Sequence, residues 1–149
     1  MASKDTVNTA PHSSNAPLAS GKRFEWLVQR LHDLRIEVGA QSVILVDKSG
    51  RLLVEVGTID GAEPAVLGMS LSNNMAASFE ISQQLREERA LNLIYHEGAR
   101  YDIYAANVDE EMFMALMFDR RQGASRVGMV WLYTKRAIQD LQNLDLGTQ

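Results

Sequence analysis

Side chains that could carry metal or nucleophile chemistry do not gather into a motif in this chain of 149 residues. The absence of cysteine excludes disulfides, thiolate chemistry and cysteine-ligated metals. The three histidines, His12, His32 and His96, have no spacing to one another or to carboxylates that would build a metal site. No glycine-rich loop is followed by Lys and Ser or Thr, so we expect no bound nucleotide. The sequence therefore predicts no catalytic residue, no metal and no cofactor.

One serine and two charged clusters could in principle serve as a nucleophile, an acid–base pair or an anion site, but each has a simpler interpretation. Ser49 lies between two expected strands, whereas a nucleophile elbow joins a strand to a helix, so we interpret Ser49 as a turn residue. The consecutive acids Asp109–Glu111 are typical of a solvated turn, because a paired acid and base need different environments. Arg120, Arg121 and Arg126 surround Gly123 at the start of the last expected helix and could hold an anion at its N-terminus. We favour a solvated loop there.

Hydrophobic periodicity predicts three helices and five strands in the order α-β-β-α-β-β-β-α. The expected elements are a helix from Ser20 to Val38, strands Ser42–Asp47 and Arg51–Val56, a helix Ala65–Leu85, strands Leu91–Tyr95, Tyr101–Asn107 and Met112–Phe118, and a helix Ser125–Leu144. The first and last strands are apolar on both faces, which places them at the centre of the sheet. With short antiparallel connections, this predicts a five-stranded antiparallel sheet ordered 2-1-5-4-3. The fold class is α/β, an α+β sandwich with helices one and three on one face and helix two on the other.

The same periodicity predicts the buried faces of the first and last helices. In the first helix these residues are Phe24, Leu27, Val28, Leu31, Leu34 and Val38, and Trp26 points away from them. In the last helix they are Val127, Val130, Trp131, Thr134, Ile138 and Leu141. Trp26 either lies against a neighbouring loop or belongs to a contact surface, where Trp is enriched.

The second helix is the most informative part of the sequence, because it has no charged residue between Glu63 and Glu80. Its expected inward stripe is Leu67, Leu71, Met75, Ser78, Ser82 and Leu85, and its outward face is Val66, Met69, Asn73, Ala76, Ala77 and Glu80. A surface helix normally has a charged outer face. An outer face of Ala, Met, Val and Asn instead favours a close-packed protein partner. In the predicted sheet order, the strand Leu91–Tyr95 is also an exposed apolar edge, which invites pairing with another chain.

Composition and charge narrow the classes of partner and location that remain. The chain is 46% hydrophobic and carries a formal net charge of -4, which argues against nucleic acid and anionic lipid as partners. No stretch approaches the ~18 apolar residues of a membrane span. We expect a disordered tail at residues 1–20, one domain at 21–146, a short C-terminal tail at 147–149, and a reducing cytoplasmic location.

The order of these elements, together with three stretches of sequence, resembles the roadblock/LC7 family. The matching stretches are Gly39–Leu53, the small-residue helix Ala65–Leu85, and Tyr101–Tyr104 leading to Phe113 and Phe118. The resemblance covers Phe24 to Leu144 and is to the bacterial gliding-motility type, whose member acts as a GTPase-activating protein. It implies a homodimer or heterodimer whose third strands pair into a ten-stranded sheet while the second helices pack side by side, and a small Ras-like GTPase as partner. The implied dimer or partner interface is Val66, Met69, Asn73, Ala76, Ala77, Glu80, Leu91, Leu93 and Tyr95.

The resemblance transfers no catalytic residue, so we expect a regulator and not an enzyme. Three functions stay open. The first is a homodimeric adaptor that presents its paired second helices to a Ras-like GTPase and stimulates GTP hydrolysis by positioning groups of the GTPase or by inserting an arginine such as Arg120. The second is a structural dimeric scaffold without a GTPase. The third is a small-molecule sensor, since helix-flanked five-stranded sheets also occur in ligand-sensing domains, although these need a cavity with convergent polar groups.

Overall fold

A computed structural model describes residues 20–87 and 92–147 of the chain. The helices are α1 (Ser20–Val38), α2 (Pro64–Gln84) and α3 (Val127–Gly147), with a short 3-10 helix η2 (Arg120–Gln122) before α3. The strands are β1 (Ser42–Asp47), β2 (Leu52–Gly57), β3 (Leu93–Glu97), β4 (Tyr101–Asn107) and β5 (Met112–Asp119). The predicted order of elements is confirmed. The expected disordered tail lies outside the described residues except for Ser20, which opens α1.

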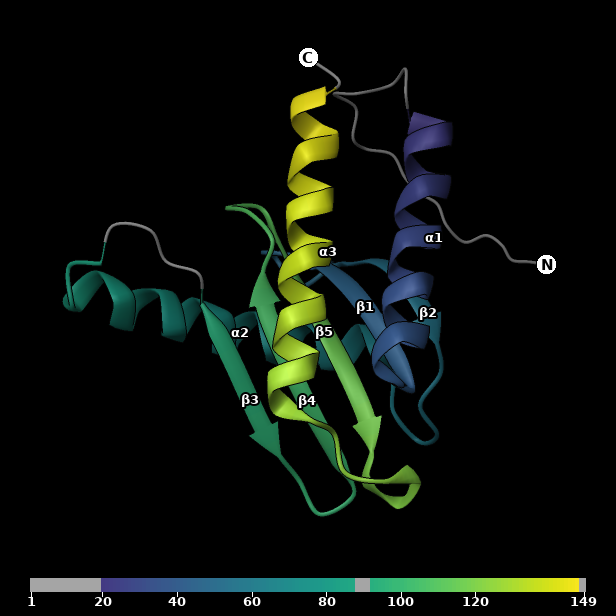
Figure 1. Ribbon diagram of the computed structural model, residues 1–149. Helices are drawn as coiled ribbons and strands as arrows, with labels where there is room; N and C mark the ends of the chain where they lie inside the picture. Colours follow the sequence, from purple (N-terminus) through teal and green to yellow (C-terminus); the bar gives the residue numbers. More distant parts are fainter. Residues whose placement is uncertain (1–19, 88–91, 148–149) are drawn as a thin grey trace.

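The five strands form one antiparallel sheet in the order β2-β1-β5-β4-β3, as predicted. Strands β1 and β5 lie inside the sheet and are buried on both faces along nearly their whole length. Helices α1 and α3 cover one face, and α2 covers the other (Figure 1). The prediction from apolar runs succeeds because a strand needs two apolar faces only where both sides of the sheet are covered.

The larger core lies between the sheet and the α1–α3 pair. Leu31 and Leu34 of α1 and Val130 and Ile138 of α3 are buried in it. Tyr104 of β4 is fully buried at its centre. Its ring contacts Phe118 and Trp131 edge to face, at centroid distances of 5.4 and 5.2 Å. Such aromatic contacts add to the stabilisation that burial alone gives.

Three residues of α1 and α3 differ from prediction in their burial. Phe24 is exposed because α1 begins well beyond the end of the sheet (Figure 1). Val127, the first residue of α3, is exposed. Trp26 was expected to point away from the core, but it is partly buried and packs against the larger core cluster. The flank of α1 is covered because α1 packs against α3, where Arg30 Nε donates to Asp140 Oδ2 at 2.8 Å.

The β1–β2 turn is built by Asp47, and it supports α2. Asp47 Oδ1 accepts hydrogen bonds from Ser49 N at 3.0 Å, Ser49 Oγ at 2.6 Å and Arg51 N at 2.9 Å. Ser49 is thus a turn residue, as predicted. Gly50 has a φ of 97°, a conformation that favours glycine, and a Cβ there would lie 3.0 Å from the Cα of Met69. The turn is therefore in close contact with the backbone of α2.

Candidate protein-interaction surface

The N-terminal half of α2 is fixed to the sheet by close backbone packing. Gly68 is buried, and a Cβ added to it would lie 3.3 Å from both Gly50 O and Val46 Cγ1. Ser72 Oγ donates to Lys48 O at 2.7 Å. The predicted inward residues Leu71 and Met75 are buried in the smaller core cluster. Small residues in this half thus let the helix lie directly on the β1–β2 hairpin.

The C-terminal half of α2 projects beyond β3, the last strand of the sheet (Figure 1). Leu85 was predicted to point into the core, but it is 65% exposed, because at that point the helix has passed the sheet. Phe79 and Ile81 are also exposed. Ser82 is buried and donates to Asn92 Oδ1 at 2.8 Å, so the helix is still tied to the start of β3.

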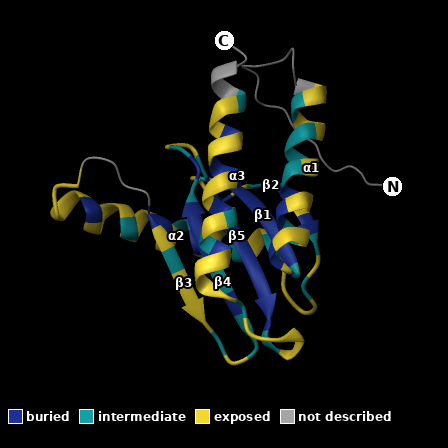
Figure 2. Ribbon diagram, viewed as in Figure 1, coloured by how far each residue is buried: buried dark blue, intermediate teal, exposed yellow. Residues whose placement is uncertain are grey.

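The predicted outer face of α2 is exposed along its whole length. Val66, Met69, Asn73, Ala76, Ala77 and Glu80 are all exposed. Figure 2 shows exposed residues predominating on α2 and β3, next to the buried central strands. The chain therefore presents apolar side chains to solvent on both the outer face and the projecting end of α2, which is typical of a surface that binds protein.

Strand β3 lies beside α2's projecting end and forms an open edge. In the described part of the chain, β4 is the strand that pairs with β3, and the other side of β3 is unpaired. Leu93 and Tyr95 are exposed and lie opposite Ala106 and Tyr104, on the face covered by α1 and α3. Leu91, also predicted at this edge, lies outside the described residues.

The sequence analysis missed Phe79 and Ile81 as surface residues, although a signal for them exists. The helix has 21 residues, which at ~1.5 Å per residue is a length of about 32 Å. Five strands ~4.8 Å apart span only about 19 Å between the outer strand axes. Since α2 runs across the strands (Figure 1), a helix of this length must extend past the sheet.

Comparison with known proteins agrees with this arrangement of elements. Residues 26–118 match the family model described as the Roadblock/LC7 domain, which is more than half of the chain. The chain belongs to the roadblock/LC7 family. Among the curated proteins, none matches it.

Solved structures of MglB are similar to this roadblock/LC7 chain. MglB of Myxococcus xanthus is 25% identical with a TM-score of 0.73, and the match covers 83% of this chain and 98% of that one. The gliding protein MglB of Thermus thermophilus is 26% identical with a TM-score of 0.68, over 80% and 87% of the two chains. An MglB structure described as having a tetrameric arrangement gives the same identity, TM-score and coverage as the Thermus protein. The resemblance to the gliding-motility type is therefore confirmed.

Two of the three arginines before α3 in this roadblock/LC7 domain, Arg120 and Arg121, are held by carboxylates. Arg120 Nη1 donates to Asp102 Oδ1 at 2.9 Å and lies 3.4 Å from Glu97 Oε2. Arg121 Nη2 donates to Asp119 Oδ2 at 2.9 Å. The hydrogen bond to Asp102 raises the pKa of Arg120, and the hydrogen bonds from Arg121 hold the pKa of the Asp119 carboxyl well below its usual range. Both arginines thus stabilise the fold through ion pairs that the solvated-loop interpretation did not include.

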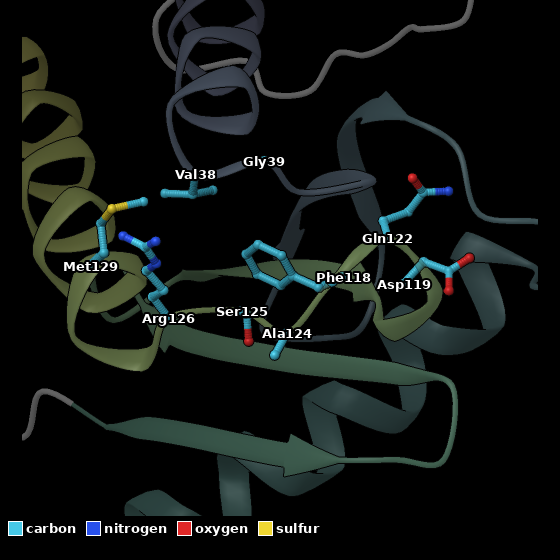
Figure 3. A pocket seen from close by; sticks show the side chains of 10 residues that line it. Val38, Gly39, Phe118, Asp119, Gln122, Ala124, Ser125, Arg126 and Met129 are labelled. Atoms are coloured by element: carbon cyan, nitrogen blue, oxygen red, sulfur yellow. The ribbon is translucent and has the colours of Figure 1, made fainter.

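A hollow of about 220 Å³ opens between the end of α1 and the start of α3 (Figure 3). Val38, Phe118 and Met129 form its apolar wall, and Arg126 lies at its rim. Of its polar residues, Asp119 is bound to Arg121, and Ser125 Oγ lies 2.7 Å from Tyr104 Oη. These two groups already bond to neighbouring side chains, and the side chains of Gln122 and Arg126 also line the hollow.

Two further observations concern the roadblock/LC7 domain as a whole. Within residues 20–87 and 92–147, no three His, Asp or Glu side chains gather in a way that could hold a metal ion. Over the same residues, no helix combines the length and hydropathy that crossing a membrane requires.

Proposed function

We propose that this roadblock/LC7 domain is a homodimeric adaptor that presents its paired α2 helices to a small Ras-like GTPase and stimulates GTP hydrolysis. The observation that carries the proposal is α2 itself. From Pro64 to Phe79 the helix has no charge, and its outer face is exposed in the single copy. An exposed apolar surface of this kind is typical of a site that a protein partner covers.

The homodimer accounts for two features that lie side by side. The open edge of β3 has unpaired backbone groups, and edges of this kind pair with another strand unless they are protected. The projecting end of α2 exposes Phe79, Ile81 and Leu85 on a helix that has run past its own sheet. A second copy that extends the sheet through β3 would place its own surface beneath this end. The tetrameric arrangement named for one MglB structure supports self-association in similar chains.

The GTPase is the partner that the family resemblance implies for bacterial members. In this proposal the chain regulates hydrolysis without being an enzyme, by positioning groups that the GTPase supplies. Arg120 is a poor candidate for an inserted arginine, because Asp102 and Glu97 already hold it. A cytoplasmic location is part of the proposal and suits a chain without cysteine.

A charge placed in the centre of the surface tests the proposal. Met69 on α2 and Ile36 on α1 are 60% and 62% exposed, so they form a matched pair. Wild type, Met69→Glu and Ile36→Glu are each mixed with a Ras-like GTPase of the same organism loaded with GTP. We expect wild type and Ile36→Glu to bind it and to accelerate hydrolysis, and Met69→Glu to lose binding at least tenfold because a charge enters a dry contact.

Light scattering over a dilution series measures self-association in the same samples. A dimer that neither binds the GTPase nor changes its hydrolysis would remove the GTPase from the proposal and favour the scaffold. A wild-type protein that stays monomeric at high concentration would refute the homodimer.

A further inference from the structure

The hollow between the end of α1 and the start of α3 lies on the side of the sheet opposite to α2. Val38 and Phe118, two of its apolar lining residues, also belong to the larger core between the sheet and the α1–α3 pair. Helix α2 packs on the other face, against the smaller core cluster (Figure 1). A molecule bound in the hollow therefore leaves the outer face of α2 uncovered.

The volume of the hollow limits the size of what it can hold. It measures about 220 Å³, which is less than the ~300–1,000 Å³ of pockets that enclose cofactors or drug-sized ligands. An apolar cavity of ~150 Å³ already takes a benzene ring. The hollow thus has room for one ring-sized group, which is the size of a single aromatic side chain of a protein.

The apolar wall of the hollow suits an aromatic ring (Figure 3). Phe118 offers a ring for offset-stacked or edge-to-face contact, the arrangements that aromatic pairs prefer. Met129 offers a thioether, which makes favourable contacts with aromatic rings. Met129 is 36% exposed, and Leu132, about one turn further along α3, is 48% exposed. Apolar surface therefore continues from the wall onto the outside of α3, where a bound partner would cover it.

The rim of the hollow carries a positive charge that no carboxylate balances within the described part of the chain. Arg126 lines the hollow, and its guanidinium forms no ion pair or hydrogen bond with any described residue. Asp119, which also lines the hollow, is already bound to Arg121 at 2.9 Å. Glu37, at the end of α1, lies 3.6 Å from Arg30. The charge of Arg126 thus favours an acidic group beside the ring, since carboxylates bind arginine through charge-assisted hydrogen bonds.

The parts of the sequence outside the described residues do not supply such a ring. Residues 1–19, 88–91 and 148–149 contain no Phe, Tyr or Trp. None of these segments can therefore fill the hollow with an aromatic side chain.

We propose that the hollow is a second docking site, which takes an aromatic side chain of a partner protein while an adjacent Asp or Glu of that partner pairs with Arg126. An aromatic anchor in a pocket is a common source of affinity in protein interfaces. Gln122 also lines the hollow, and its amide can bond to the backbone of the bound segment. The proposal goes beyond the proposed function, because the docking site and the α2 surface lie on opposite sides of the sheet. The domain can therefore hold this partner and an α2 partner at the same time.

Titration with short synthetic peptides tests the docking site. The probe is acetyl-Asp-Phe-Asp-amide, and the two controls replace Phe by Ala or both Asp by Lys. Each is added to the full-length chain labelled with nitrogen-15. We expect the probe to shift the amide signals of Gly39, Phe118 and Met129 and to leave that of Met69 on α2 unchanged. Both controls should bind at least fivefold more weakly, because one lacks the ring and the other repels Arg126. A probe that shifts none of the three signals at millimolar concentration would overturn the proposal.

A matched pair of variants tests the role of Arg126. Arg126→Glu and Lys135→Glu make the same charge change at exposed positions at the start of α3 and within it, and of the two residues Arg126 is the one that lines the hollow. Arg126→Glu should weaken the probe at least fivefold, since it replaces an attraction by a repulsion, and Lys135→Glu should bind within twofold of wild type. Equal weakening by both would show a general charge effect and overturn the ion pair.

Two further results separate this site from its alternatives. Met69→Glu should bind the probe as wild type does, so failure of the α2 surface to bind a GTPase leaves the docking site standing. If the signals of Phe118 and Met129 instead shift on concentrating the chain without any peptide, a second copy occupies the hollow, and the proposed partner is wrong.

Discussion

Truncation of Phe79 on the projecting end of α2 should weaken self-association strongly. Phe79 is 48% exposed in the single copy. Since a phenylalanine buries about 200 Å² when enclosed, about 100 Å² remains for a partner to cover. At ~25 cal/mol per Å², this corresponds to about 2.5 kcal/mol in each copy. In the proposed two-fold dimer the change occurs twice in the interface, which gives about 5 kcal/mol at full coverage. With about 1.4 kcal/mol for each tenfold change, the dimer Kd rises more than a thousandfold.

Phe24 provides the control for this experiment. It is 42% exposed, nearly as much as Phe79, but it lies on α1, on the other side of the sheet. Phe79→Ala and Phe24→Ala remove the same atoms from similarly exposed positions, so both should fold as the wild type does. Sedimentation equilibrium over a wide concentration range gives the Kd of each protein. Circular dichroism confirms that each variant melts near the wild-type temperature.

Two results would refute the reasoning. If Phe79→Ala changes the dimer Kd by less than tenfold, the projecting end of α2 is not covered by a second copy. If Phe24→Ala weakens the dimer as much as Phe79→Ala, the interface includes α1, and the assignment of the surface to α2 and β3 fails.

Three predictions concern the stability of the single copy. Gly50→Val should lower the free energy of unfolding by about 2–4 kcal/mol in urea titrations, because a β-branched residue is strained at its φ of 97° and its Cβ meets the Met69 backbone; an unchanged midpoint would contradict the turn geometry. Arg86 has a φ of 59° where α2 ends, and Arg86→Gly should raise the melting temperature by an amount equivalent to about 1 kcal/mol. Hydrogen bonds from Arg121 lower the pKa of Asp119 in the folded chain. The ionised Asp119 side chain therefore contributes its full stabilisation of the fold above the unfolded-state Asp pKa of about 3.9, and this contribution is lost as the pH falls below that value. Asp119→Asn should thus be less stable than wild type at pH 7, with a gap that closes in acid melts below about pH 4; a gap independent of pH would exclude the ion pair as its cause.

The sheet order could be predicted because its cause is local in sequence. Strands β1 and β5 are unbroken apolar runs, and each connection from β3 to β5 is a short turn. Together these two constraints leave few possible orders for the five strands in the sheet. The uncharged face of α2 was predicted for the same reason, since it follows from residue type and helical period alone.

The burial of some side chains and the partners of others could not be predicted in this way. They depend on how far one element lies from another, and helical or strand periodicity does not encode such distances. Leu85 has the right angular position for burial, but the sheet ends before the helix does. Trp26 is covered because α1 packs beside α3. Arg120 pairs with Asp102 across the β4–β5 pair, eighteen residues away in the chain. Each case needs the packed structure, because the partner comes from a different element.

Gly68 is in close contact with the β1–β2 turn, so the packing at this point sets the tilt of α2 relative to the sheet. From Gly68 to Leu85 the helix extends about 25 Å at ~1.5 Å per residue. A methyl group at Gly68 would be 3.3 Å from Gly50 O and Val46, so the helix or the turn would have to move by a few tenths of an ångström. Tilting about that point would displace the far end by a larger distance. The direction of the projecting end is thus set by the packing at Gly50 and Gly68, and a substitution at either glycine would re-aim Phe79, Ile81 and Leu85 while leaving those side chains unchanged.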